Sequence, residues 1–134
     1  MILGVDPGER RYGVAIADES TRFARPLEVI DAHRTDPVAR LAEIVRAFSV
    51  GEIVVGRPVS LSGRAGAAVE SRADFVDRLR TTVEVTVHEF DERLSTVVAE
   101  QGLRAAGGSR RARRRIVDAV AAQVMLQNYL DANR

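Results

Sequence analysis

Short apolar runs recur along the chain and predict five β-strands. The first two, at 2–6 and 12–17, flank Pro7-Gly8, where proline fixes one φ angle and glycine tolerates a positive one. Three further strands are expected at 26–30, 52–55 and 83–90. Because no helical pattern separates the first three strands, we expect them to form an antiparallel meander.

Apolar residues at helical spacing predict helices between and after the later strands. Thr35 or Asp36 caps the first helix, and Pro37 suits its first turn. Its apolar positions are Val38, Leu41, Ile44, Val45 and Phe48. The other helices are expected at about 67–80, after a small-residue loop at 59–66, at 92–106, ended by Gly107-Gly108, and at 112–132. This order predicts one α/β domain whose mixed sheet is antiparallel on one side and parallel on the other.

Composition narrows the class of protein. A chain of 134 residues with 46% hydrophobic residues is typical of one globular domain. The absence of cysteine excludes a disulfide scaffold and a cysteine-based zinc site. No signal-like apolar run precedes Asp6, and no apolar stretch reaches the roughly 20 residues that span a bilayer. We therefore expect a cytoplasmic protein with no membrane partner.

Charge is divided unevenly along the chain, although the net charge is only +1. Residues 1–102 are acidic overall, and residues 103–134 are basic. The basic excess comes from the arginine run, defined as Arg110, Arg111, Arg113, Arg114 and Arg115. A solvated surface is one interpretation, but positive charge at a helix start opposes the helix dipole, which favours an anionic partner such as a phosphate backbone. With 4% aromatic residues, base stacking on single strands is not expected.

Acidic residues mark one end of the predicted sheet. Asp6 ends the first strand, and Asp91 and Glu92 follow the last one. Asp118 lies early in the last helix, on its alanine-bearing face. Ligands of such sheets gather beyond the carboxyl ends of parallel strands, and carboxylates that converge there repel one another unless a cation such as Mg²⁺ lies between them. Two such ions can activate water for phosphodiester hydrolysis.

Each acidic residue also has a purely structural interpretation. Asp6 can hydrogen-bond its own turn, and Asp91 and Glu92 can stabilise the start of a helix. Asp118 can lie in solvent. Position in the sequence alone leaves these alternatives open.

Four motifs, in order over nearly the whole chain, together resemble one known family. They are DPGERRYGVA from Asp6, VGRP from Val55, DERLST from Asp91, and the segment from Ser109 to Leu130 that contains Asp118. They are similar to those of the YqgF family, also called RuvX. Its members are nucleases with a ribonuclease H-like fold, related to the RuvC Holliday junction resolvases.

The resemblance implies a ribonuclease H-like fold, with a five-stranded sheet of order 3-2-1-4-5 and helices on both faces. It also implies a nuclease site that uses two divalent cations, Mg²⁺ or Mn²⁺. The acidic residues of this site would be Asp6, Glu92 and Asp118. Arg93 and the arginine run would then bind phosphates of structured nucleic acid. The family is associated with 5′-end maturation of the precursor of 16S ribosomal RNA, and by analogy with RuvC it is named a Holliday junction resolvase.

Two departures from the family pattern bear on the site. A glutamate ends the fourth strand in RuvC, but this chain has Gly56-Arg57 there, so Glu92 or Asp91 must supply the second carboxylate. Ser60 and Ser62 stand in the loop at 59–66, where members commonly carry Asn and an acid.

Three functions remain to be distinguished. A metal-dependent nuclease is favoured. A nucleic-acid-binding domain that has lost catalysis would keep the arginine run without cleavage, and the absent fourth-strand acid favours it. A nucleotide phosphotransferase of the actin-like superfamily shares the strand-Asp-turn-strand pattern but would need two such domains. The sequence does not show whether the substrate is RNA or DNA, or whether the enzyme is an endonuclease or an exonuclease. It also does not show whether the protein forms a homodimer.

Overall fold

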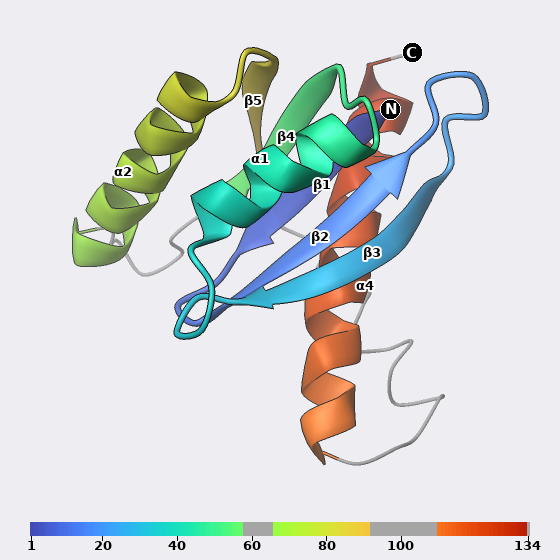
Figure 1. Ribbon diagram of the computed structural model, residues 1–134. Coiled ribbons are helices and arrows are strands. Elements are labelled where there is room, and N and C mark those ends of the chain that lie inside the picture. Colours follow the sequence, from blue (N-terminus) through green and yellow to red (C-terminus); the bar gives the residue numbers. More distant parts are fainter. Residues whose placement is uncertain (58–65, 92–109, 134) are drawn as a thin grey trace.

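The computed structural model describes residues 1–57, 66–91 and 110–133. They form a mixed sheet of order β3-β2-β1-β4-β5 with helices on both faces (Figure 1). The strands are β1 (Ile2–Pro7), β2 (Arg11–Ala17), β3 (Ala24–Asp31), β4 (Glu52–Arg57) and β5 (Thr86–Asp91). β2 is antiparallel to both of its neighbours, and β4 is parallel to both β1 and β5. The predicted meander, mixed sheet and strand order are therefore confirmed.

Helices cover the two faces of the sheet unequally. α1 (Pro37–Ala47) and α2 (Gly66–Thr82) pack on one face, and α4 (Arg110–Ala132) crosses the other (Figure 1). Asp36, rather than Thr35, caps α1, because its side chain accepts a hydrogen bond from the Val38 amide at 3.2 Å. The predicted helix at 92–106 and most of the predicted loop at 59–66 lie outside the described residues.

One local prediction is wrong. The strand expected at 83–90 begins only at Thr86, because the chain has just left α2 at Val83, whose amide still donates to the Leu79 carbonyl at 3.0 Å. Gly8 does not adopt a positive φ angle. Glycine is needed there for space instead, since a Cβ would lie 2.6 Å from the carbonyl oxygen of Arg11.

Side-chain alternation along β1 separates two apolar cores. Leu3 and Val5 are fully buried in the core beneath α1 and α2. Ile2 is buried in the other core, beneath α4. Gly4 faces α4 as well, because a Cβ on it would lie 2.8 Å from the Cβ of Leu126. Successive side chains on a strand point to opposite faces, so the side chain of Asp6 belongs to the α4 face.

The second half of α4 is tied to the β2–β3 hairpin by glutamine side chains. Gln127 accepts from the Ala24 amide at 2.9 Å and donates to the Arg22 carbonyl at 3.0 Å. Gln123 donates to the Ala24 carbonyl at 3.1 Å. Arg22 in turn donates from Nη2 to the Leu130 carbonyl at 2.9 Å. These bonds fix the position of α4 along its own axis.

Replacing Gln127 by alanine is expected to lower the free energy of unfolding by about 1–3 kcal/mol, because the buried Ala24 amide loses its acceptor. Urea denaturation measures the change. Asn128→Ala is the matched control, since Asn128 is the next residue on the same helix and is exposed. Equal stability of the two variants would contradict the role given to Gln127.

Candidate functional site

A close contact between α4 and β2 brings two acidic residues together. A Cβ on Gly13 would collide with the carbonyl oxygen of Asp118 and lie 2.6 Å from its carbonyl carbon. Gly13 is also the register partner of Asp6 in the antiparallel β1–β2 pair. Partners in such a pair have Cα atoms about 5 Å apart. Asp118 therefore lies against Gly13, which is the direct neighbour of Asp6 on the adjacent strand.

The side chains of Asp6 and Asp118 stand at the border of the core beneath α4. Both residues are half-buried. Ala121, Ala122 and Met125, at the helical spacing that places them on the face of Asp118, are buried against the sheet. The prediction that this face of the helix points inward is confirmed. Two acidic residues whose backbones come together on one face, both partly withdrawn from water, raise the local negative charge, and a cation can compensate it.

On the other side of β1, the end of β4 carries a glycine, whereas the fourth strand of RuvC ends in a glutamate. The β1–β4 register pairs Val5 with Val55, so the residue that follows beside Asp6 is Gly56, which brings no side chain. Gly56 pairs with Phe90 on β5, and the next pair is Arg57 with Asp91. β5 is two strand spacings from β1, about 9–10 Å.

The second carboxylate of the predicted site falls at the limit of the described chain. Asp91 is the last residue of β5, and its backbone lies at the same end of the sheet as Asp6. Glu92 and Arg93 are outside the described residues, so their predicted roles stay predictions. The choice between Asp91 and Glu92 therefore remains open.

The arginine run occupies the first turns of α4. The helix begins at Arg110, so all five arginines lie on it, and this part of α4 projects past the sheet (Figure 1). Their side chains are outside the described residues. Phosphate binding by these arginines stays a prediction.

The donor chemistry of the acidic pair fits Mg²⁺ or Mn²⁺. Both cations prefer carboxylate oxygens, and Mg²⁺ retains several waters, so one or two carboxylates can hold it. Asp6 and Asp118 supply such oxygens. Within residues 1–57, 66–91 and 110–133, no group of three or more acidic or histidine side chains is arranged to hold a metal. The third acidic residue of the predicted site, Glu92 or Asp91, is therefore not identified by the side chains that the structure describes.

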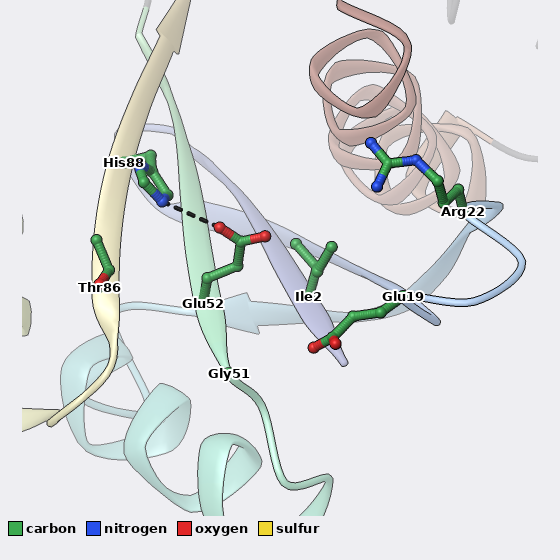
Figure 2. A pocket seen from close by; sticks show the side chains of 7 residues that line it. All are labelled: Ile2, Glu19, Arg22, Gly51, Glu52, Thr86 and His88. Carbon is green, nitrogen blue, oxygen red and sulfur yellow. Dashed lines mark ion pairs between the residues drawn. The ribbon is translucent and has the colours of Figure 1, made fainter. Parts of the chain in front are cut away.

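A pocket of about 350 Å³ opens at the opposite end of the sheet (Figure 2). Its lining comes largely from the first residues of β1, β4 and β5, and consists of Ile2, Glu19, Arg22, Gly51, Glu52, Thr86 and His88. Two of its carboxylates already have partners, because Glu52 lies 3.0 Å from His88 Nε2 and Glu19 lies 3.1 Å from the N-terminal ammonium group. Ligands of open α/β sheets bind beyond the carboxyl ends of the strands, so this pocket is separate from the acidic pair.

Gly13 is a position to which sequence reasoning assigned no role. It lies within the first motif, but nothing in that motif indicates what approaches it. Only the packing of α4 on the sheet reveals that its missing side chain makes room for Asp118.

Known proteins resemble this chain over nearly its full length. The sequence model of the RuvX family, described as a Holliday junction resolvase, matches residues 1–132. A relative from Chloroflexus aggregans, named "Putative pre-16S rRNA nuclease", is 43% identical over 99% of this chain and 94% of its own length. A relative of the same name from an Anaeromyxobacter species is 45% identical over 96% of this chain and 95% of its own length.

Solved structures show the same fold at low sequence identity. RuvC from T. thermophilus, in complex with a Holliday junction substrate, is 18% identical and has a TM-score of 0.61, with 98% of this chain and 94% of that chain covered. Fowlpox virus resolvase, in a complex with Holliday junction DNA, is 11% identical and has a TM-score of 0.57, with 98% and 97% covered. The predicted ribonuclease H-like fold is confirmed. No helix in the described parts of the chain is long and apolar enough to cross a membrane.

Proposed function

Because the chain belongs to the RuvX family, we propose that it is a divalent-metal-dependent nuclease that hydrolyses phosphodiester bonds in structured nucleic acid. The observation that carries this proposal is the approach of Asp118 to Asp6 across Gly13. Two carboxylates from distant parts of the chain, at the carboxyl end of β1, supply the oxygen ligands that a divalent cation prefers. The single domain formed by residues 1–134 would hold the complete site.

Each acidic residue has a distinct role in the proposed reaction. Asp6 and Asp118 would hold Mg²⁺ or Mn²⁺, two ions in the complete site, beside the scissile phosphate. When bound, the ions neutralise the charge that develops on the phosphate and make water a better nucleophile. Glu92 contributes a third carboxylate or orients the attacking water. Water attacks phosphorus, and the bond to the leaving sugar oxygen breaks.

The 5′ end of the precursor of 16S ribosomal RNA is the favoured substrate. Relatives with more than 40% identity over nearly the full chain carry that activity in their name. Arg93 and the arginine run, at the start of α4, would bind phosphates of the folded RNA. These arginines would bind the phosphate backbone of RNA and DNA alike. RNA is therefore favoured only because of the names of the relatives.

A four-way DNA junction is the second candidate substrate. The description of the RuvX family and the folds of two junction-bound resolvases favour it. The glycine beside Asp6 on β4 weighs against it, because RuvC has a glutamate at the end of its fourth strand. That glycine also favours a nucleic-acid-binding domain without catalysis.

Cleavage assays with both substrates test the proposal. The purified protein is expected to cut a precursor RNA that carries the 5′ extension of 16S ribosomal RNA in Mg²⁺ or Mn²⁺, and not in EDTA. A four-way junction of matched length is assayed in parallel, and faster cleavage of the junction would replace the first substrate by the second. Tight binding of either substrate with no cleavage in any of these metals would overturn the nuclease and leave a binding domain.

Substitution of the two candidate carboxylates after β5 identifies the third acidic residue. Glu92→Gln is expected to reduce cleavage at least tenfold, because the proposed site then lacks a ligand or a group that orients the water. Asp91→Asn, the adjacent matched change, is expected to leave the rate within about twofold. Steady-state cleavage in Mg²⁺ measures both rates. The reverse result would assign the role to Asp91.

A further inference from the structure

Two loops lie side by side at the end of the sheet that carries Asp6 (Figure 1). One is the turn between β1 and β2, at 8–10, and the other connects β3 to α1, at 32–36. The amide of Ala32 donates to the carbonyl oxygen of Arg10 at 2.8 Å, which joins the two loops. They therefore form one continuous edge of the molecule.

This edge begins a short distance beyond the acidic pair. In the β2–β3 register, Arg11 pairs with Asp31, and Gly13 pairs with Val29. Gly13 is the partner of Asp6, so the Arg11–Asp31 pair lies two residues, about 7 Å, further along the sheet. The edge is therefore near enough to the acidic pair for one nucleic-acid strand to contact both.

At this edge, two arginines from different loops converge on one carboxylate. We call Arg10, Asp31 and Arg34 the Asp31 cluster. The Nε and Nη2 atoms of Arg10 each lie 3.4 Å from a carboxylate oxygen of Asp31, and Nε of Arg34 lies 3.9 Å away. The side chain of Asp31 is 29% exposed, whereas those of Arg10 and Arg34 are 54% and 75% exposed. The cations thus point outward, and their counter-ion is recessed.

The contacts within the Asp31 cluster are too long and too exposed to account for it as a stabilising ion pair. Exposed pairs contribute about 0–1 kcal/mol, and hydrogen bonds weaken beyond about 3.2 Å. Each guanidinium has five N–H donors in a planar fork, a geometry that suits phosphate oxygens. Of the nearby acids, Asp36 is already paired with Arg78 at 3.0 Å.

We propose that the Asp31 cluster binds a backbone phosphate of the nucleic acid, adjacent to the phosphate at Asp6 and Asp118. The inference rests on the proposed function, since the acidic pair defines which phosphate is cleaved. Asp31 lies 3.4 Å from Arg10 and 3.9 Å from Arg34, so its charge keeps both guanidinium groups at this edge before the substrate arrives. The cluster is separate from Arg93 and the arginine run.

Salt-dependent binding tests the cluster without requiring cleavage. The double variant Arg10→Gln/Arg34→Gln and the unmodified protein are titrated, in EDTA, with a labelled RNA duplex and a DNA duplex of the same sequence. The logarithm of the affinity is plotted against the logarithm of the salt concentration between about 50 and 200 mM. Loss of one phosphate contact is expected to reduce the slope by about 0.9 on B-DNA, with a similar loss on RNA.

The matched control removes the same charge at the far end of the sheet. Arg25, at the start of β3, and Arg46, in the last turn of α1, are both exposed. Arg25→Gln/Arg46→Gln is expected to leave the slope unchanged. Equal slope losses in the two double variants would overturn the cluster, because net charge alone would then explain them, and so would an unchanged slope in the cluster variant.

The outcome separates this inference from the nuclease itself. Metal-dependent cleavage together with an unchanged slope in the cluster variant would overturn the cluster alone. A reduced slope without any cleavage would overturn the nuclease and retain the cluster as a phosphate contact. A loss on only one of the two duplexes would support the cluster and assign it to that nucleic acid.

Discussion

Replacing Asp6 by asparagine is expected to lower the rate of metal-dependent cleavage about 10³-fold, with the fold retained. The amide is nearly the same size as the carboxylate, but it loses the charge that holds the cation, and metal ions supply several kcal/mol of transition-state stabilisation. Single-turnover cleavage in Mg²⁺ and in Mn²⁺ measures the effect. Asp74→Asn, an exposed change on α2, is the matched control and is expected to cleave at the unmodified rate.

Stability measurements give the Asp6→Asn variant a second readout. In EDTA the variant is expected to unfold at the same or a higher temperature than the unmodified protein, because the repulsion between Asp6 and Asp118 is removed. Added Mn²⁺ raises the unfolding temperature of a protein that binds it only when folded, and this increase is expected to be smaller in the variant. Cleavage by Asp6→Asn at the unmodified rate would eliminate the proposed site.

Replacing Gly13 by alanine is expected to impair both stability and cleavage. The added Cβ would collide with the carbonyl oxygen of Asp118, which belongs to the backbone and cannot rotate away. Overpacking of this kind costs about 1–3 kcal/mol. Any relief requires α4 to move from the sheet, which separates Asp118 from Asp6. We therefore expect at least a tenfold lower cleavage rate and weaker Mn²⁺ binding at a temperature where the variant is folded.

Gly4→Ala is the matched control for this change. Its Cβ would also meet α4, at 2.8 Å from the Cβ of Leu126, but on a part of the helix away from Asp118. Both variants are expected to lose stability, as measured by urea denaturation, and only Gly13→Ala is expected to lose Mn²⁺ affinity. Equal Mn²⁺ affinities in the two folded variants would show that Gly13 serves packing alone.

Local sequence pattern predicted most of the secondary structure, because burial of one face imposes a period on each element. The strands around Pro7-Gly8 and the helix from Pro37 appear where the apolar periodicity places them. The pattern failed at Val83, where the chain leaves α2 before it enters β5. Alternating apolar residues are compatible with both elements there, and only the backbone hydrogen bond to Leu79 keeps Val83 out of the strand.

The candidate site was predictable in its residues more than in its geometry. Asp6 is recognisable as an acid at a strand end, and Asp118 as a carboxylate on an inward face of a helix. The resemblance to a known family connected them with Glu92. The Asp31 cluster was not predictable, because Arg10 and Arg34 belong to loops that meet only after β2 and β3 have paired.

Periodicity and turn chemistry act between residues that are close along the chain, and so the sequence was sufficient for the type and order of the elements. The approach of Asp118 to Asp6 depends on how deeply α4 packs on the sheet. That depth is set by the absence of a side chain at Gly13 and by the hydrogen bonds of Gln127 to the β2–β3 hairpin. These contacts join residues far apart in sequence, and no local pattern encodes them. The tertiary structure alone therefore decides that a turn aspartate and a helix aspartate become neighbours on one face of the sheet.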